Sequence, residues 1–488
     1  MKIAFVSTEA LPFAKTGGLA DVAGVLPKHL EKLGCEVKLF IPKYYSIDEA
    51  KYNLHYNWGI GEIKIKIAGH LRSVHIYQTK LEGSNVEVNF VDCPHYFHRG
   101  HLYTNDPDED ERFILFSKGV IESLQRLHWA PDVIHCNDWQ TGLIPLLLKD
   151  NYSWDKLFEK TASLFTIHNI GYQGLFPKST LEKAEINEKY FYPAGPVEFY
   201  DKFSFMKAAL NYSDIITTVS KTYAKEILTK EYGAGLENVL LNRVNDLYGI
   251  LNGVDYSIWN PETDKQIPFA YSKDQLEGKL KNKEYLLLLF GIPFKAEVPL
   301  IGIVSRIVEQ KGFDIFVDSL LQLTEIDAQW IILGSGEDKY EDMFHSLVNQ
   351  YPQKFGAYIG FNNELSHLVE AGVDIFLMPS RYEPCGLNQI YSLKYGTVPV
   401  VRNTGGLADT ITDYRKNKEI GNGFSFNEYS GKELASTLKD AVEFFQQKDE
   451  WKKIQFNGMM ADFSWEDSAN EYLKLYKKVI KKKISEEK

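Results

Sequence analysis

The sequence is poor in cysteine, in long apolar runs and in net positive charge. Its 488 residues contain only four cysteines, scattered and without a C-x-x-C pair, so neither a disulfide framework nor a zinc site is expected. No segment approaches the run of about 18 apolar residues that a membrane span requires, and the apolar run at residues 3–7 is too short for the core of a signal peptide. We therefore expect a cytoplasmic protein that binds no membrane.

The charge balance argues against a non-specific nucleic-acid-binding protein. The formal net charge is −11 at pH 7, whereas non-specific nucleic-acid binding requires a basic surface. Hydrophobic residues make up 44% and charged residues 25% of the chain, as in ordinary globular proteins. At about 150 residues per domain, the length predicts two or three domains. Any anionic ligand must therefore meet a local cluster of cations.

The first half of the chain alternates strand-like and helix-like segments. A helix-like segment at residues 19–30 lies between apolar runs at 2–8 and 36–41, which is a βαβ pattern. Three alternating runs between residues 63 and 91 predict an antiparallel excursion from the parallel sheet. The polar segment 259–264 has the composition of a linker. Further strands are expected at 133–137, 164–168 and 215–219, and further helices at 112–127, 141–148 and 203–210.

The second half repeats this rhythm. Short buried strands that alternate with helices form doubly wound sheets, so the predicted fold class is α/β, with two Rossmann-like doubly wound domains facing each other across a deep cleft. We place the first domain at residues 1–256, joined by a C-terminal helix at 465–488, and the second at 257–464. The charged end, 481–488, is expected to be a solvated, fraying tail. Strands of the second domain are expected at 300–305, 330–334, 357–360, 375–379 and 398–401.

Two cations mark the turn after the first of these later strands. Arg306 and Lys311 lie between the apolar run that ends near residue 305 and the helix-like segment that begins at Phe313. In α/β sheets such turns lie at the carboxyl ends of strands, beside helix N-termini that favour anions. An Arg offers a planar fork for two phosphate oxygens, and a Lys a compact charge. The pair is a candidate site for a phosphorylated ligand, although two solvated surface cations would give the same pattern.

Nucleotide-binding motifs of other enzyme classes are missing. The turn after the first strand reads KTGG at residues 15–18 instead of G-x-G-x-x-G, and no Gly-Lys pair is followed by Ser or Thr as in a P-loop. Residues 108–110 read DED, a D-x-D sequence that could hold a metal diphosphate. Because this acidic run precedes a helix, whose dipole favours carboxylates, we expect a solvated helix start there instead.

Three longer stretches carry a resemblance to a known family. They read KTGGLADV at residues 15–22, RIVEQK at 306–311 and PSRYEPCGL at 379–387, with HNIGYQG at 168–174 and ILNGVD at 250–255 between them. Together they resemble bacterial glycogen synthases and plant starch synthases over nearly the whole chain. The resemblance implies a GT-B hexosyltransferase that needs neither a metal nor a cofactor.

The reaction implied by this resemblance is glycogen synthesis. Glucose would pass from a nucleotide diphosphate sugar, usually ADP-glucose in bacteria, to the non-reducing 4-OH end of an α-1,4-glucan such as glycogen. The anomeric configuration would be retained and ADP released. The sequence leaves open whether UDP-glucose is the donor instead, and whether Glu383 acts covalently or only electrostatically.

The resemblance also implies roles for particular residues. Arg306 and Lys311 match the pair that grips the departing phosphates, and Glu383 matches the carboxylate that orients the transferred glucose. His168 and Asp138 match residues near the sugar, which completes the five expected catalytic residues. The expected substrate-binding residues are Lys15, Gly17, Gly18, Asp21, Asn252, Cys385, Gly386, Leu387, Thr404 and Gly405.

Two positions depart from related enzymes, and one short sequence occurs twice. Tyr391 stands where the wider GT-B group has a second Glu, as it does in the synthase branch, and Phe361 stands where many relatives carry Tyr. The sequence TGGLAD occurs at residues 16–21 and again at 404–409. Two Gly-rich helix starts could hold one anion from opposite sides. Chance, or the shared chemistry of helix starts, is the alternative.

Three other functions share some of these features. A glucan phosphorylase has the same two-domain plan but needs pyridoxal phosphate on a lysine. A hydrolase would use two carboxylates that flank the glycosidic bond, and would release glucose without any nucleotide. A scaffold would bind glucan without transferring glucose to it, although the retained Lys15, Arg306, Lys311 and Glu383 argue against this alternative.

Overall fold

The computed structural model describes residues 1–486, which divide into two compact units. Unit 1 comprises Met1–Gly253 together with the residues from Trp465 onward, and unit 2 comprises Val254–Ser464. The chain therefore crosses from one unit to the other twice. Each unit is built on its own largely parallel sheet.

The sheet of unit 1 follows the alternating pattern of the first half. Its ten strands are β1 (Lys2–Val6), β2 (Glu36–Pro42), β3 (His55–Tyr56), β4 (Ile63–Ile67), β5 (His70–Lys80), β6 (Glu87–Asp92), β7 (Val133–Asn137), β8 (Ala162–Ile167), β12 (Ile215–Thr218) and β13 (Leu247–Gly249). Their order is β13-β12-β8-β7-β1-β2-β6-β5-β3, with β4 paired to β5. The predicted antiparallel excursion is confirmed for β4 and β5, whereas β6 returns to the parallel sheet beside β2.

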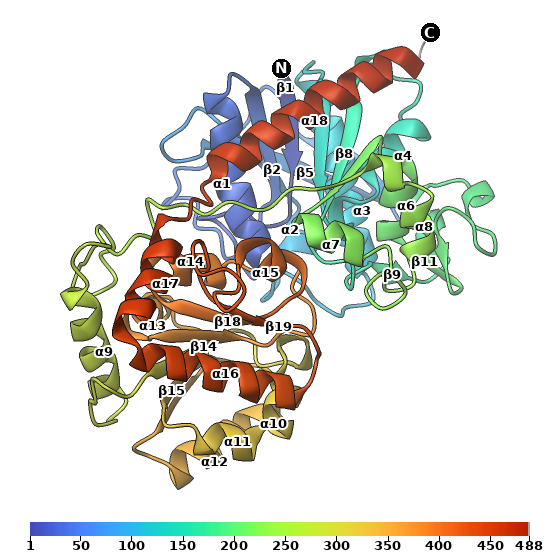
Figure 1. Ribbon diagram of the computed structural model, residues 1–488. Coiled ribbons are helices and arrows are strands. Elements are labelled where there is room, and N and C mark those ends of the chain that lie inside the picture. The colour runs from blue at the N-terminus through green and yellow to red at the C-terminus, as the bar shows by residue number, and fades with distance from the viewer. Residues whose placement is uncertain (487–488) are drawn as a thin grey trace. The chain divides into compact units, whose positions relative to one another are not determined.

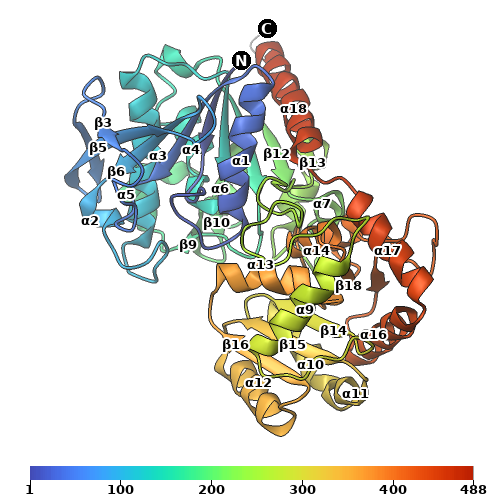
Figure 2. The same ribbon diagram turned by 90° about the vertical axis from the view of Figure 1, so that its left-hand side faces the viewer.

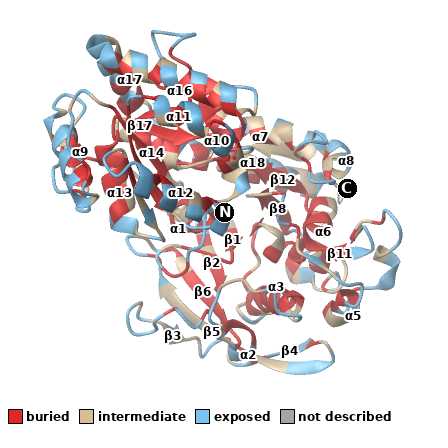
Figure 3. Ribbon diagram, turned by 90° about the horizontal axis from the view of Figure 1, so that it is seen from below, coloured by how far each residue is buried: buried red, intermediate tan, exposed pale blue. Residues whose placement is uncertain are grey.

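Helices cover both faces of this sheet, and for that reason its central strands are apolar along most of their length. In β1, Ile3 and Phe5 face one way and Ala4 and Val6 the other, and all four are fully buried, as the red strands of Figure 3 show. A small sheet is formed by β9 (Leu175–Phe176), β10 (Glu198–Phe199) and β11 (Lys202–Ser204). The helices are α1 (Gly18–Lys32), α2 (Pro94–Phe97), α3 (Glu109–Arg126), α4 (Ile144–Lys149), α5 (Thr180–Ala184), α6 (Phe205–Tyr212), α7 (Lys221–Glu226), α8 (Glu237–Leu241) and α18 (Trp465–Glu486).

The C-terminal helix belongs to unit 1. In Figure 1, α18 lies along this unit beside α1, and it also contacts β8. Near its end, Lys482 Nζ donates to Asp246 Oδ1 at 2.7 Å. The prediction of a fraying tail at 481–488 is wrong as far as Glu486, because the helix continues to that residue, whereas the predicted solvation is confirmed at Lys481, Ile484 and Ser485, which are exposed. Residues 487–488 lie outside the described part of the chain.

Unit 2 contains a parallel sheet of six strands. These are β14 (Leu300–Val304), β15 (Gln329–Gly334), β16 (Phe355–Ile359), β17 (Ile375–Met378), β18 (Val398–Arg402) and β19 (Phe424–Phe426), in the order β16-β15-β14-β17-β18-β19. Its helices are α9 (Glu277–Leu289), α10 (Phe313–Asp318), α11 (Leu320–Glu325), α12 (Asp338–Gln350), α13 (Asn363–Gly372), α14 (Asn388–Lys394), α15 (Gly405–Thr410), α16 (Gly431–Gln446) and α17 (Lys448–Met460).

Alternate residues of the sheet in unit 2 serve two separate cores. Ile301 and Ile303 of β14 pack in the core that contains Phe316 of α10. Leu300, on the opposite face, packs in the core that contains Leu286 of α9 and Val369 of α13. Figure 2 shows α9 and α13 side by side. Both faces are therefore buried, which explains the continuous apolar runs of the second half.

The segment 259–264, predicted as a linker, lies within unit 2 and is packed against it. The Trp259 ring is stacked between the rings of His367 and Tyr391, with centroid distances of 3.7 and 3.9 Å. Asp264 Oδ2 lies 2.7 Å from His367 Nδ1, and both side chains are buried. The partners of these residues lie about a hundred positions away in the sequence. This stretch is packed onto unit 2.

Candidate active site

In unit 2, most of the expected site residues lie on loops that leave the sheet at one place. The strand order runs one way from β14 to β16 and the other way from β17 to β19. In open α/β sheets, ligands bind at the carboxyl ends of the strands where the order reverses. The loops that follow β14, β17 and β18 supply the residues described next.

Lys311 and Glu383 form the centre of this arrangement. Lys311 Nζ lies 2.6 Å from Glu383 Oε2, and Ser380 Oγ donates to the same oxygen at 3.0 Å. Glu383 is only 6% exposed. Gly312 makes this approach possible, because its φ is +85° and a Cβ there would lie 2.1 Å from Pro379 O. The loops after β14 and β17 therefore meet backbone to backbone.

Arg306 lies at the rim of the same loop. Its side chain is exposed, and its Nη2 is 3.4 Å from Gln310 Oε1, which is a weak contact. The Gln310 backbone is better anchored, since Arg381 N donates to Gln310 O at 2.9 Å. The structure thus holds Lys311 against Glu383, whereas Arg306 lies exposed at the edge of the loop.

The remaining expected residues of unit 2 pack around Glu383. Gly406 N donates to Glu383 O at 3.1 Å, and Gly405, at φ +47°, has no room for a Cβ beside the same oxygen. Thr404 is buried at the start of α15. The stretch 385–387 leads into α14 through Gly386, whose φ is +71°. The expected residues of this unit are thus brought together around one carboxylate, apart from Arg306 at the rim.

Unit 1 brings Asp138 and His168 together at the ends of β7 and β8. Asp138 Oδ1 accepts from the backbone N–H groups of His168 at 2.8 Å and Asn169 at 3.4 Å. Burial raises the pKa of the Asp138 carboxyl to about 7, and these two N–H groups oppose the shift. Asp138 has φ +57°, which is unusual for a residue other than glycine and is the kind of backbone strain found at functional sites.

The state of the His168 ring follows from its neighbours. Burial lowers its pKa to about 3, so the ring is neutral at pH 7. Its Nε2 lies 3.0 Å from Asn137 Oδ1, and the Asn137 amide is oriented because Nδ2 donates to Val6 O at 3.0 Å. Nε2 therefore donates its proton to Asn137. This leaves Nδ1 as an acceptor for an incoming hydroxyl.

The loop between β1 and α1 supplies a cation. Lys15 Nζ lies 2.8 Å from Asp21 Oδ1. Burial raises the pKa of Asp21 above its usual range, and the Lys15 charge opposes this shift. Gly17 immediately precedes Gly18, the first residue of α1. A Cβ added to Gly17 would meet no described atom within 4 Å, so the surface beside it is open.

Asn252 was predicted as a site residue, whereas Glu9 was not. Asn252 is buried, and within residues 1–486 its Oδ1 has no hydrogen-bond partner. It lies where the chain leaves unit 1, one residue before the boundary at Gly253. Glu9 was not predicted at all, yet its carboxylate binds the loop that follows Lys15. The available signal was that Glu9 is the only charged residue between Lys2 and Lys15.

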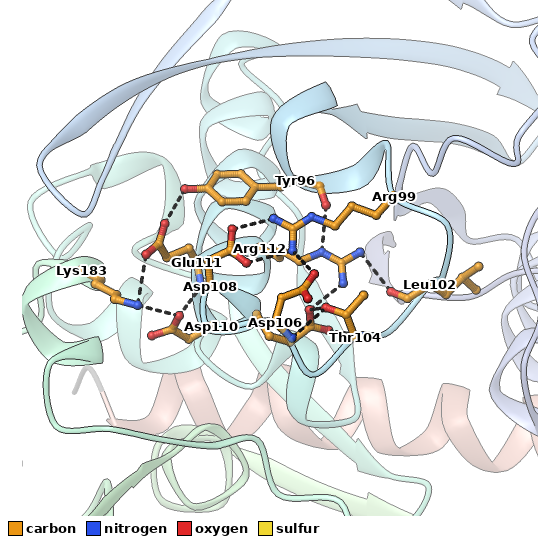
Figure 4. Close-up of polar contacts among 11 residues, drawn as sticks. Tyr96, Arg99, Leu102, Thr104, Asp106, Asp108, Asp110, Glu111, Arg112 and Lys183 are labelled. Carbon is orange, nitrogen blue, oxygen red and sulfur yellow. Dashed lines mark hydrogen bonds and ion pairs between the residues drawn. The ribbon is translucent and has the colours of Figure 1, made fainter.

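The acidic run at 108–110 is neither a metal site nor a solvated helix start. Figure 4 shows Asp108 beside Arg99 and Asp110 beside Lys183. Asp108 pairs with both terminal nitrogens of Arg99, Glu109 with the buried Arg112 at 2.7 Å, and Asp110 with Lys183 at 2.9 Å. The prediction of solvated carboxylates is wrong because Glu109 and Asp110 are buried. These ion pairs fix the start of α3.

Comparisons with known proteins cover both units. A model described as a starch synthase catalytic domain matches residues 2–242, and one described as glycosyl transferases group 1 matches 289–455. A glycogen synthase of Thermosipho melanesiensis is 46% identical over 485 residues, which cover 99% of this chain and 100% of that protein. One from Thermotoga maritima is 45% identical over 99% of each chain. The chain belongs to the glycogen synthase and starch synthase family. The predicted resemblance is confirmed.

Solved structures of this family and beyond share the fold. The catalytic domain of starch synthase IV from Arabidopsis thaliana, bound to ADP and acarbose, is 31% identical with a TM-score of 0.91, and the match covers 98% of this chain and 99% of that one. Sucrose-phosphate synthase from Thermosynechococcus elongatus is 17% identical with a TM-score of 0.61, over 98% of both chains. The α/β fold with two Rossmann-like units is the predicted GT-B fold. Among the described residues, no helix is long and apolar enough to cross a membrane.

Proposed function

We propose that the protein is a glycogen synthase that transfers glucose from ADP-glucose, with retention, to the non-reducing 4-OH end of an α-1,4-glucan and releases ADP. Identity of 44–46% to glycogen synthases over essentially the whole length supports this activity. The observation that carries the site assignment is the Lys311–Glu383 pair where the strand order of unit 2 reverses. In this proposal unit 2 binds the diphosphate of the nucleotide sugar, and unit 1 binds the glucan acceptor and supplies further contacts to the sugar donor.

Arg306 and Lys311 stabilise the departing diphosphate. Breaking the glycosyl–phosphate bond places negative charge on the leaving group, and cations fixed in advance stabilise that charge without reorganisation. Lys311 is already held by Glu383, whereas the exposed Arg306 moves onto the phosphates. Loss of one such group costs roughly a hundred- to a thousandfold in rate.

Glu383 orients the transferred glucose. Lys311 and Ser380 both contact Oε2, so Oε1 is the atom that faces a sugar hydroxyl. A carboxylate already paired with a lysine is a poor nucleophile, and this pairing favours an electrostatic role. The leaving phosphate then takes the proton of the acceptor hydroxyl. In unit 1, neutral His168 accepts a hydroxyl proton of glucose at Nδ1, and Asp138 holds the backbone of His168.

A single assay tests this proposal. Purified protein is mixed with glycogen and with either ADP-glucose or UDP-glucose, and release of the nucleoside diphosphate is followed. We expect ADP release that depends on glycogen, with a higher kcat/KM for ADP-glucose. Faster turnover of UDP-glucose would contradict the choice of donor. Free glucose formed without a nucleotide would indicate a hydrolase, and glucan binding without diphosphate release a scaffold.

A further inference from the structure

A buried carboxylate in unit 1 grips the loop between β1 and α1. Glu9 is 3% exposed. Its Oε2 accepts the backbone N–H groups of Thr16 at 2.6 Å and Gly17 at 3.0 Å. Its Oε1 accepts the Thr16 hydroxyl at 2.6 Å and the Tyr103 hydroxyl at 2.7 Å. Four donors face this carboxylate, two on each oxygen.

Removing this side chain would leave the N–H groups of Thr16 and Gly17 without their acceptor. A glutamine could replace it, because its oxygen would accept those two N–H groups and its NH2 group would donate to the two hydroxyls, which can accept as well as donate. Tyr103 is fixed as well, because its oxygen lies 2.9 Å from Thr8 Oγ1. The contact therefore joins the end of β1, the loop at 15–18 and the segment around Tyr103 into one rigid group.

Glu9 also lies beside the predicted ligand-facing residues. Burial is the main cause of the raised pKa values of Asp21 and Asp138, and the charge of Glu9 adds to both. Lys15, next to the gripped Thr16, is half-exposed and reaches Asp21. The Cβ direction of Gly17 opens on empty space. Glu9 is thus surrounded by the groups that a donor would meet in this unit.

We propose that Glu9 is a positioning residue that fixes the 15–18 loop for the sugar donor. Because Glu9 takes the N–H groups of Thr16 and Gly17, those two groups are not available to the diphosphate. The loop instead presents the Lys15 cation and the open side of Gly17. This inference rests on the proposed function, since it assumes that this loop meets the nucleotide sugar. It assigns to Glu9 a role in donor affinity that is separate from acceptor binding.

The test compares Glu9→Ala with Glu198→Ala. Glu198 is a matched control, because it is a buried carboxylate of the same unit that accepts backbone N–H groups from Ala194 and Asp201 at 2.8 and 2.7 Å. Amide hydrogen exchange at residues 16 and 17 is measured together with Tm and with KM for ADP-glucose and for glycogen. Tyr103→Phe, which removes one donor, is included as a milder variant.

We expect Glu9→Ala to speed exchange at residues 16 and 17 at least tenfold and to raise KM for ADP-glucose at least tenfold, with KM for glycogen unchanged. Tyr103→Phe should change the exchange rate and this KM in the same direction by a few fold, and it provides the test if Glu9→Ala does not fold. Glu198→Ala should lower Tm without either effect. Unchanged exchange, or an equal rise in both KM values, would overturn the inference. Absence of ADP release by the wild-type protein would instead overturn the proposed function, while the exchange measurement still tests the grip of Glu9.

Discussion

The two copies of TGGLAD share six residues and little else. Both follow a parallel strand and begin a helix: the copy at 16–21 begins α1, which has 15 residues, and the copy at 404–409 begins α15, which has six. The first copy is held by a side chain, the carboxylate of Glu9. The second is held by backbone, since Gly406 N donates to Glu383 O. The shared residues specify the start of a helix, whereas the contacts around each copy differ.

The glycines of the two copies show the same difference in space. No described atom lies within 4 Å of the position that a Cβ on Gly17 would take, whereas a Cβ on Gly405, the equivalent residue of the second copy, would lie 1.9 Å from Glu383 O. The first copy is therefore open on one side, as a loop that receives a ligand would be. The second is closely packed and supports Glu383 from behind. Whether both copies face one anion stays a prediction.

Removing the cations beside the second copy should have the largest effect. We expect Arg306→Ala and Lys311→Ala each to lower kcat about a hundred- to a thousandfold, or roughly 3–4 kcal/mol of transition-state stabilisation. Lys311→Ala should also lower Tm, because the buried Glu383 loses its partner, whereas Arg306→Ala should not. Steady-state kinetics and thermal unfolding measure these effects.

The control is Lys418→Ala, which breaks an exposed ion pair with Glu450 in the same unit. It should leave both kcat and Tm nearly unchanged, since exposed pairs contribute little. If both site variants turn over at near wild-type rates, these cations have no part in the reaction.

Adding a methyl group to the closely packed second copy should have the next largest effect. Gly405→Ala forces a Cβ against the carbonyl oxygen of Glu383, and overpacking of this kind typically costs about 1–3 kcal/mol. We expect a clear loss of Tm in the transition that reports on unit 2, accompanied by loss of activity because Glu383 is displaced. Differential scanning calorimetry gives the measurement. A variant with wild-type Tm would show that the loop after β17 moves aside without a measurable loss of stability.

Much of the fold could be predicted from apolar periodicity alone. The buried strands β1 and β14 are largely apolar runs. What the sequence could not show is partnership between polar residues far apart. Asp264 and His367 are 103 positions apart, and Asp110 and Lys183 are 73 apart. The predictions of a linker at 259–264 and of a solvated helix start at 108–110 missed these distant partners.

The residues of the candidate site also differ in whether the sequence could predict them. Lys311 and Glu383 were predicted because each lies in a motif that resembles a family pattern, and the structure places them 2.6 Å apart. Glu9 carries no such motif, because its function depends on four donors that only the folded loop gathers. A lone acid within an otherwise uncharged stretch was the single available clue.

The open side of the first copy can be tested with Gly17→Ala. Its backbone is extended, with φ −153°, a conformation that alanine adopts without strain. We expect Tm to stay within about one degree, while KM for ADP-glucose rises roughly tenfold, or about 1.4 kcal/mol, because the added methyl group occupies space kept for the donor. The comparison with Gly405→Ala is direct: the same substitution at the same position of the six-residue sequence should affect binding in one unit and stability in the other. A wild-type KM would mean that the space beside Gly17 is not used.

The smallest expected effect concerns Asp138, which shares the first copy's unit. Its carboxyl has a native pKa of about 7, raised by burial from an ordinary value of 3.8. The native state therefore binds more protons than the unfolded state between about pH 4 and 7, so this group makes the wild-type protein less stable as pH rises through that window. Asp138→Asn keeps the oxygen that accepts from His168 N but has no proton to lose. We expect the Tm of the variant minus that of the wild type to rise by a few degrees from pH 5 to pH 8.

The matched control for this pH dependence is Asp214→Asn. Asp214 also accepts a backbone N–H group in unit 1, from Ser163 at 2.8 Å, but its native pKa is lowered, because the Lys149 charge and the hydrogen bonds from Ser163 outweigh burial. Its stabilising effect is present above its ordinary pKa and is lost only in more acidic solution, so its Tm difference should be constant from pH 5 to pH 8. A constant difference for Asp138→Asn as well would show that the Asp138 carboxyl titrates as an ordinary acid. The strained turn after β7 would then hold a charged group at neutral pH, and the part of Asp138 in the reaction would be that of an anion beside the neutral ring of His168.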